Sequence, residues 1–137
     1  MTIGVGIGGS QGLMAGLLAR INTGGAGRVY AYNGARPATG AAHTATLVCM
    51  CLLAQPAGTV NASGDLVLAQ GTDSTVLGNL PPQWARVCDG NDNFLFDCHA
   101  RLSNAANTGQ ELVFASTGMF LGGLTRIVSG TLSGRTA

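Results

Sequence analysis

The stretch from Gln83 to His99, QWARVCDGNDNFLFDCH, constrains the fold more than any other part of the chain. Two short runs rich in aromatic and branched residues flank the segment 89–92, whose sequence is Asp-Gly-Asn-Asp. Gly-Asn at the centre of such a segment is typical of a two-residue hairpin loop, because it tolerates the positive φ values that the loop needs. We therefore predict two antiparallel strands joined by a tight turn.

The predicted turn fixes how the two strands pair. A two-residue loop places Cys88 opposite Asn93 and Trp84 opposite Asp97, and alternation then sorts the side chains onto two faces. The apolar face consists of Ala85, Val87, Phe94, Phe96 and Cys98. The mixed face consists of Trp84, Arg86, Leu95 and Asp97. In this register Arg86 lies diagonal to Asp97, so the two side chains can pair.

Length and charge narrow the function classes. The chain has 137 residues, enough for one core but not for two. Charged residues make up 9% of it, against about 25% in an ordinary soluble domain. The net charge of +1 gives no electrostatic case for nucleic acid, and no apolar run approaches the roughly 18 residues of a membrane span. All 7 basic residues are Arg, which favours planar contacts at interfaces but also fits the codon bias of a G+C-rich genome.

The first nine residues alternate apolar side chains with glycine. Ile3, Val5 and Ile7 stand between glycines, and a strand of this kind packs little and loses much backbone entropy. We expect residues 1–9 to form a flexible arm that becomes ordered by adding to the sheet edge of a neighbouring subunit. Ile3, Val5 and Ile7 are therefore candidate protein–protein contacts. The segment lacks the basic start of a signal peptide, so we expect the protein to remain in the cytoplasm where it is made.

A G-x-G-x-x-G match at Gly4, Gly6 and Gly9 does not predict a dinucleotide site. Too few residues precede it for the strand that the fold requires, and no acidic residue follows about 20 positions on. Ser10 is instead the expected N-cap of a helix over about residues 11–22. The apolar stripe of that helix consists of Leu13, Met14, Leu17, Leu18 and Ile21, and small residues occupy the opposite side.

The rest of the chain predicts short strands separated by turns. These strands are expected at residues 28–33, 44–54, 65–70, 75–77, 111–116 and 124–132, besides the central hairpin. The expected fold is mainly β: a β-sandwich or jelly-roll-like domain of about six to eight short antiparallel strands with one N-terminal helix. Residues 10–137 form this single domain after the arm.

No set of residues predicts catalysis, a cofactor or a metal. Cys49 and Cys51 form a C-x-C on a strand, which lacks the turn of a zinc knuckle, and buried thiols are the simpler interpretation. Cys98 and His99 face opposite ways on a strand, so they cannot act as a nucleophile pair. With 6 acidic residues and no Lys, general acids and bases are scarce. We expect a protein that is not an enzyme.

Trp84 and Arg86 are the other candidate protein–protein contacts. Both residue types are enriched at the anchors of interfaces. A lone Trp is also readily covered by its own chain. If Trp84 is a contact, Trp84→Ala weakens assembly more than it weakens folding.

Two segments together resemble a known family. They are VYAYNGARPATGAAHTATLVCMCLLAQPAG, residues 29–58, and WARVCDGNDNFLFDCHA, residues 84–100. Their N-G-x-R-P-A turn and W-x-R-V-x-D-G hairpin resemble stretches in small virion structural proteins of tailed bacteriophages and prophages. The resemblance covers residues 28–101 and the position of the N-terminal helix. The chain departs from the pattern in its glycine-rich arm and in having Cys at 49, 51, 88 and 98, where Thr, Leu, Val or Gly would be usual.

The resemblance implies a non-enzymatic component of a virion. The expected role is a capsid cement or decoration protein that self-associates and bridges subunits of a major capsid protein, without contacting nucleic acid or membrane. A tail or baseplate component is the alternative within the particle. A carbohydrate-binding surface module, with Trp84, Tyr30 and Tyr32 as stacking platforms, is the alternative of another class.

Overall fold

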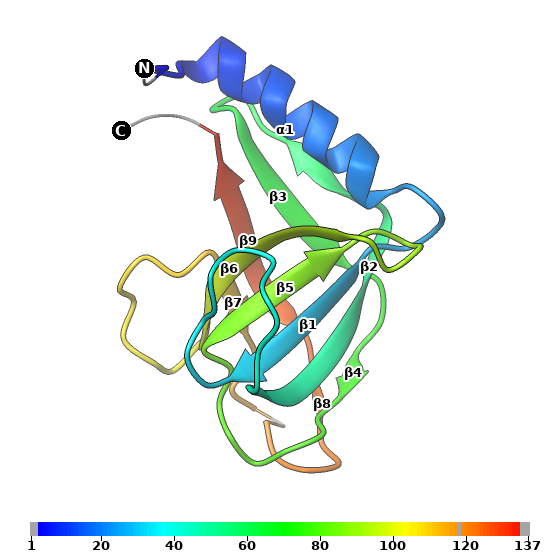
Figure 1. Cartoon of the computed structure of the whole chain (residues 1–137), viewed down its shortest axis with the longest axis vertical. Coiled ribbons are helices and arrows are strands. Elements are labelled where there is room, and N and C mark those ends of the chain that lie inside the picture. Colours follow the sequence, from blue (N-terminus) through cyan, green and yellow to red (C-terminus); the bar gives the residue numbers. More distant parts are fainter. Residues whose placement is uncertain (1–2, 118, 135–137) are drawn as a thin grey trace.

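A computed structural model, which describes residues 3–117 and 119–134, contains a β-barrel with a helix across one end (Figure 1). The elements are α1 (Ile7–Ile21), β1 (Arg28–Asn33), β2 (Thr46–Val60), β3 (Asp65–Gln70), β4 (Ser74–Thr75), β5 (Trp84–Cys88), β6 (Phe94–Leu102), β7 (Leu112–Phe114), β8 (Leu124–Thr125) and β9 (Ile127–Ser133). The barrel closes in the order β1-β2-β3-β9-β7-β6-β5, and β4 pairs with β8 in a separate small sheet. Figure 1 shows α1 at one end of the barrel and the β4–β8 sheet at the other.

The prediction of a mainly β fold with one N-terminal helix is confirmed. The expected antiparallel pairing holds around the barrel except between β6 and β7, which run parallel, with Ala100 opposite Leu112 and Leu102 opposite Phe114. Parallel pairing arises because loop 103–111 carries the chain back along the barrel before β7 begins. The strand order is that of a closed barrel, so a jelly-roll connectivity stays a prediction.

Helix α1 begins earlier than predicted. Ile7 is its first residue, preceded by Gly6 in extended conformation, so residues 7–9 of the predicted arm are helical. Ser10 is therefore not an N-cap. Its hydroxyl is buried, donates to the carbonyl of Gly64 and accepts the N–H of Gly134. Of the predicted arm, residues 3–6 precede the helix, and residues 1–2 lie outside the described residues.

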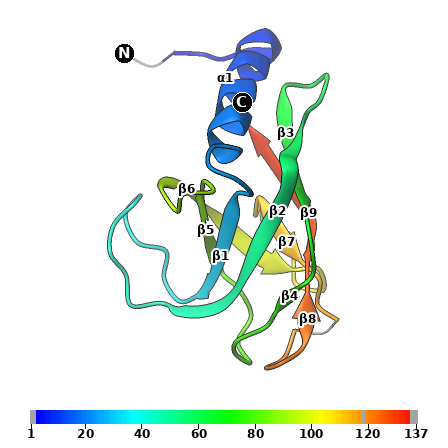
Figure 2. The same cartoon turned by 90° about the vertical axis from the view of Figure 1, so that its right-hand side faces the viewer.

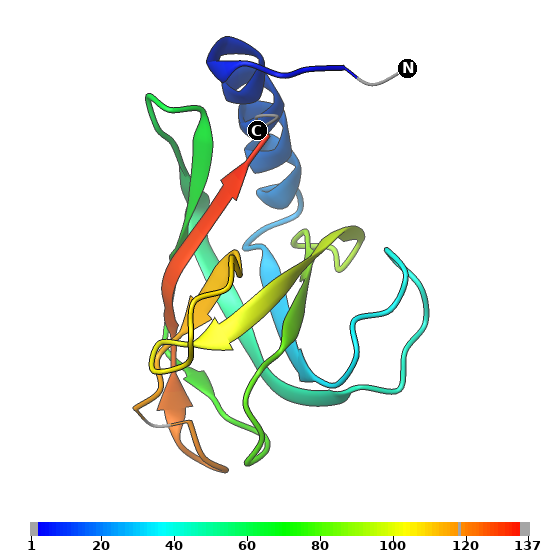
Figure 3. The same ribbon diagram turned by 90° about the vertical axis from the view of Figure 1, so that its left-hand side faces the viewer.

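The apolar stripe of α1 covers the open end of the barrel. Met14 and Ile21 are buried, and Leu17 and Leu18 are partly buried against the same core. Leu13 is the exception, with 55% of its surface exposed. Figures 2 and 3 show the helix lying over the barrel end, with the last strand, β9, ending beside it.

Strand β2 is longer than predicted, because it bends instead of ending near residue 54. Its first part pairs with β1 and its last part with β3, and the register shifts between Leu53 and Gly58. A side chain at Gly58 has no room, since a Cβ there would lie 2.1 Å from the carbonyl oxygen of Val67. Glycine therefore allows the bent strand to cross from one side of the barrel to the other.

The central hairpin forms, but from Trp84 to Val87 its register lies two residues from the predicted one, and a bulge reduces the shift to one residue at Cys88. Trp84 lies opposite His99, and Arg86 lies directly opposite Asp97. The turn is longer than two residues, because the Asp89 N–H bonds to the carbonyl of Asn93, and the Asp89 carboxylate also accepts the Asn93 N–H. Gly90 packs against the loop after α1, where a Cβ would lie 2.5 Å from the carbonyl carbon of Gly24.

Candidate functional site

Trp84 lies inside the protein and is not an exposed contact. Its relative exposure is 0%. The indole ring stacks on Tyr32 at a centroid distance of 4.6 Å, and His43 meets it edge-on at 4.9 Å. The guanidinium carbon of Arg86 lies 5.4 Å from the centre of the indole ring. Three side chains of the same chain thus cover Trp84, as in the intrachain interpretation of a lone Trp.

Arg86 is engaged within the chain as well. Its Nε lies 2.8 Å from Oδ1 of Asp97 and its Nη2 lies 3.1 Å from Oδ2, so the two side chains form a bidentate ion pair. The predicted pairing of Arg86 with Asp97 is confirmed, although the residues face each other directly. The same Nη2 donates to the carbonyl of Ala41 at 2.9 Å. Arg86 therefore binds a loop of its own chain and is not a free surface anchor.

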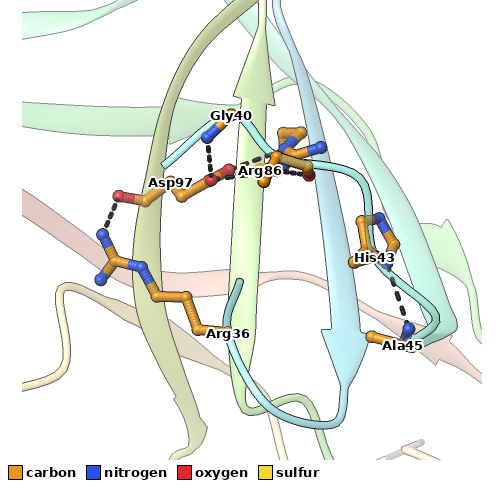
Figure 4. Close-up of polar contacts among 7 residues, drawn as sticks. Arg36, Gly40, His43, Ala45, Arg86 and Asp97 are labelled. Carbon is orange, nitrogen blue, oxygen red and sulfur yellow. Dashed lines mark hydrogen bonds and ion pairs between the residues drawn. The ribbon is translucent and has the colours of Figure 1, made fainter. Parts of the chain in front are cut away.

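The loop between β1 and β2, residues 34–45, is fastened to the hairpin through Asp97, and we call it the latched loop. Gly40 N–H donates to Oδ2 of Asp97 at 3.0 Å, and Arg36 donates to the Asp97 carbonyl at 3.0 Å (Figure 4). Figure 2 shows the loop curving away from the barrel wall before it returns to β2. A hollow of about 480 Å³ lies along it, lined by residues 33–37 and 43–46.

The environment of Asp97 keeps its side chain charged. The side chain has 0% relative exposure. Burial alone would raise the pKa of Asp97, but the hydrogen bonds from Arg86 and Gly40 and the positive charge of Arg86 outweigh burial, so the pKa is lowered. We call the contacts that Asp97 makes with Arg86, Gly40 and Arg36 the latch. Because the carboxylate stays ionised, the latch is charged at neutral pH. Its groups hold the loop in place and leave no acid or base free for proton transfer.

Two of the buried cysteines, Cys88 and Cys98, are poorly suited to act as nucleophiles. Burial raises the pKa of the Cys98 thiol to about 12 and also raises that of Cys88, so both thiols stay protonated, and a thiol is a weak nucleophile. Within residues 3–117 and 119–134, no three His, Cys, Asp or Glu side chains gather as a metal site would require.

The three predicted contacts of the N-terminal segment differ in their surroundings. Ile3 precedes the helix with 73% exposure, and Ile7 lies in the first turn of α1 with 49% exposure. Val5 is half-buried, close to Gly9 in the helix. Figure 3 shows the segment before α1 running away from the barrel. Ile3 and Ile7 are therefore available to a partner in a way that Trp84 is not.

A group of exposed apolar side chains lies at the end of the barrel opposite α1, where β4 and β8 lie. We call this group the apolar tip; it consists of Leu77, Leu80, Phe120, Leu121 and Leu124, which are between 48% and 61% exposed. The two loops that carry these residues are joined, because Leu121 N–H donates to the side chain of Asn79 and Gly122 N–H donates to the carbonyl of Val76. Both stretches are free of charged residues, over residues 74–85 and 112–125.

Sequence reasoning missed the apolar tip because its residues come from two distant loops. The usable signal was the absence of charge over both stretches, together with large apolar residues between strands where turns are normally polar. The hairpin contains the one Trp of the chain, and this residue type predicted an interface anchor at a position where the structure has a core residue.

Comparisons with known proteins found no family model, curated protein or solved structure that matches the chain. Among the described residues, no helix has the length and apolar character needed to cross a membrane. Function is therefore inferred from the residues and the geometry described above.

Proposed function

We propose that this protein is a non-enzymatic structural component of a tailed-phage virion, and that it acts as a capsid cement or decoration protein. In this role it self-associates and bridges neighbouring subunits of a major capsid protein. It is made in the host cytoplasm and resides in the particle. A jelly-roll-like β fold, as expected for such a component, stays part of the proposal.

The apolar tip is the observation that carries the proposal. Five large apolar side chains without a charged neighbour in sequence are a liability on a free monomer, and an exposed patch of this kind normally marks a contact with a partner. Depletion of charge is also what distinguishes the centre of an interface from the remaining surface. A protein present in many copies on a shell can rely on such weak contacts, because repetition multiplies their effect.

The family resemblance gives separate support. Its two sequence segments supply Arg36 and Gly40 on one side and Arg86 and Asp97 on the other, and these residues meet in the latch. The resemblance therefore rests on residues that contact one another in the fold. This agreement between the two segments supports the resemblance to virion structural proteins on which the proposal draws.

The proposal is tested on purified particles. We expect the protein in particles at a stoichiometry comparable to that of the major capsid protein, with density on the shell in cryo-electron microscopy. A tail or baseplate part, built as a small symmetric ring, would be present in roughly a few dozen copies or fewer. Absence of the protein from particles would rule out both placements.

The tip itself is tested by Leu121→Asp. Leu121 is 61% exposed, so the variant is expected to fold with an unchanged melting temperature. Its binding to particles that lack the protein should weaken by at least about 2 kcal/mol, the loss expected when an anchor residue of an interface is removed. The measurement is co-sedimentation with particles over a range of protein concentrations.

The matched control is Leu13→Asp, an equally apolar residue on α1 with 55% exposure at the other end of the barrel. It should bind particles as the unmodified protein does. Equal weakening by both substitutions would mean that added negative charge, and not the tip, changes binding.

The carbohydrate-binding alternative loses most of its predicted platform. Trp84 is buried and Tyr32 stacks on it, while the Tyr30 hydroxyl donates to Asp92. A glycan-array experiment with the isolated protein separates this alternative from the virion proposal, because reproducible binding to one class of glycan would favour the surface module.

A further inference from the structure

Two residues of opposite charge, Asp73 and Arg126, lie beside the small β4–β8 sheet. The ladder of that sheet pairs Ser74 with Thr125. Continued by one residue, the same antiparallel register brings Asp73 opposite Arg126. Both residues are exposed, and they border the two uncharged stretches, 74–85 and 112–125, that carry the apolar tip.

Neither of these two charges has a partner in its own chain. Within residues 3–117 and 119–134, the side chains of Asp73 and Arg126 make no ion pair and no hydrogen bond, either with each other or with another residue. By contrast, the carboxylates of Asp89, Asp97 and Glu111 all accept hydrogen bonds from the chain. The fold therefore leaves one cation and one anion free at the same place on its surface.

The two charges line a common hollow of about 640 Å³. Its lining consists of residues 70–73, Ala115, Thr117 and residues 126–128, of which Asp73 and Arg126 are the charged members. The Gln70 Oε1 accepts the N–H of Ile127, so this side chain is already occupied. The free polar groups that the hollow offers to a partner thus include one carboxylate and one guanidinium.

Large apolar side chains flank Arg126 on the same outward side. Leu124 and Val128 are 58% and 57% exposed, and residues 124, 126 and 128 alternate with buried residues at 125 and 127. We call Asp73, Leu124, Arg126 and Val128 the charge-pair face; its Leu124 also belongs to the apolar tip. Exposed apolar side chains rimmed by polar groups normally mark a contact with another protein.

We propose that the charge-pair face binds the same face of a second copy of this chain. In a two-fold symmetric interface every contact occurs twice, so Arg126 of each copy would pair with Asp73 of the other. The inference rests on the proposed function insofar as that function requires self-association. It predicts that self-association begins with symmetric dimers.

Charge complementarity favours a second copy over another partner. A different protein would have to present an acid and a base with the matching spacing, whereas a second copy always has both. The net charge of +1 gives two copies little reason to repel each other. The planar guanidinium of Arg126 suits a bidentate contact with a carboxylate. Burial of Leu124 and Val128 around the two pairs would add an apolar contribution.

Charge reversal tests the contact in solution, without particles. Asp73→Arg makes both charges of the face positive, and Arg126→Asp makes both negative. Each variant alone should associate with itself at least roughly tenfold more weakly than the unmodified protein, because like charges meet across the two-fold axis. Sedimentation velocity over a range of protein concentrations measures the dissociation constant.

Mixing the two variants is the decisive measurement. In a mixed dimer each Arg meets an Asp, so an equimolar mixture of Asp73→Arg and Arg126→Asp should associate again, and added salt should weaken that association. Two misfolded proteins would not complement each other in this way. An ion pair formed within one chain would not do so either, because neither variant keeps both signs of charge.

The matched control is Arg20→Asp, at an exposed position of α1, which changes the net charge as Arg126→Asp does. It should associate with itself as the unmodified protein does. Equal weakening by Arg20→Asp would overturn the proposal, because net charge and not the face would then govern association. The same holds if the two reversed variants keep a normal melting temperature but stay monomeric when mixed.

The outcome stays separate from that of the proposed function. Particle binding that depends on Leu121, together with no association of the mixed variants, would leave the cement role intact and reject the charge-pair face as the place of self-association. Association of the mixed variants with no protein in particles would support the face and reject the virion role. Loss of particle binding by Arg126→Asp, with an unmodified protein that is monomeric in solution, would assign the face to a particle protein and reject the second copy.

Discussion

Asp97 is the side chain through which distant parts of the chain hold each other. It accepts hydrogen bonds from Arg86 on the neighbouring strand and from Gly40 in the latched loop, and its carbonyl accepts one from Arg36. A buried carboxylate with several charged or backbone donors is strongly favoured in its ionised form. Removing it leaves Arg86, whose side chain is only 16% exposed, without its partner.

Asp97→Asn is therefore expected to destabilise the protein by about 3–5 kcal/mol, as when one member of a buried ion pair is lost. Chemical denaturation at neutral pH measures the change. Asp92→Asn is the matched control, because Asp92 is 52% exposed and its contact with Arg28, at 3.6 Å, lies on the surface. That variant should lose less than about 1 kcal/mol, and similar losses in both would contradict the importance of burial.

The lowered pKa of Asp97 also predicts how stability depends on pH. The folded protein binds a proton at Asp97 less readily than the unfolded chain, whose Asp pKa is about 3.9. The contribution is complete above that value and is lost as pH falls through the folded pKa, so the stability difference between the protein and Asp97→Asn should shrink below about pH 4. Asp89, whose pKa is lowered by the backbone hydrogen bond from Asn93, affects both proteins alike.

Trp84 is expected to act on folding and not on assembly, the reverse of the expectation for an exposed anchor. Trp84→Ala should cost about 3–5 kcal/mol, because it leaves a cavity beside Tyr32 and His43. Trp84→Phe keeps an aromatic ring and should cost less. Thermal unfolding of the two variants provides the measurement, and a normal melting temperature for Trp84→Ala would show that the indole is dispensable to the core.

Contacts local to one hairpin could be predicted from sequence, and contacts between distant segments could not. The Arg86–Asp97 pair was predictable because the actual register at Arg86 differs from the predicted one by two residues, and such a shift keeps both side chains on the same face. The burial of Trp84 depends on Tyr32 and on the loop that carries His43, and neither is adjacent in sequence. The pattern of apolar residues within the hairpin therefore could not predict these contacts.

At the scale of elements, α1 is docked through a polar contact as well as an apolar stripe. The Ser10 hydroxyl joins the turn before β3, through Gly64, to the residue that follows β9, Gly134. The same side chain that would have capped an isolated helix is used here to fix the helix on the barrel. Its burial makes both hydrogen bonds obligatory, since no water replaces them.

Ser10→Ala is expected to destabilise the protein by about 1–3 kcal/mol, the cost of leaving the buried carbonyl of Gly64 and the partly buried N–H of Gly134 without partners. Ser63→Ala, in the exposed turn beside Gly64, is the matched control and should be nearly neutral. Amide hydrogen exchange adds a local measurement, because α1 should lose protection before the barrel does. Uniform loss throughout the chain would show that helix and barrel unfold as one unit.

Strand bounds were most predictable where a strand is straight. The predicted ranges 28–33 and 65–70 coincide with β1 and β3. The range predicted for β2 ended too early, because the bend near Gly58 places a proline and a glycine inside the strand, and these residues usually mark the end of a strand. The predicted register of the hairpin was wrong because the turn is longer than the dipeptide Gly-Asn suggests. The Asp89 side chain stabilises this longer turn by accepting the N–H groups of Asn91 and Asn93.

At the scale of the molecule, the two ends of the barrel differ in character. One end has α1 and the apolar segment before it, and the other has the apolar tip. Low charge over the chain suggested self-association, but only the folded structure brings the tip residues together.

The hydrogen bond from Gly134 N–H to the Ser10 hydroxyl joins residues 124 positions apart, so the start of α1 and the residue after β9 lie side by side. Where the chain is opened matters little to a barrel whose strands are paired all the way round. A permuted gene that links residue 134 to the start of α1 and opens the chain within loop 103–111 keeps every strand pair of the barrel. Only the covalent connection across the parallel pair β6–β7 is given up.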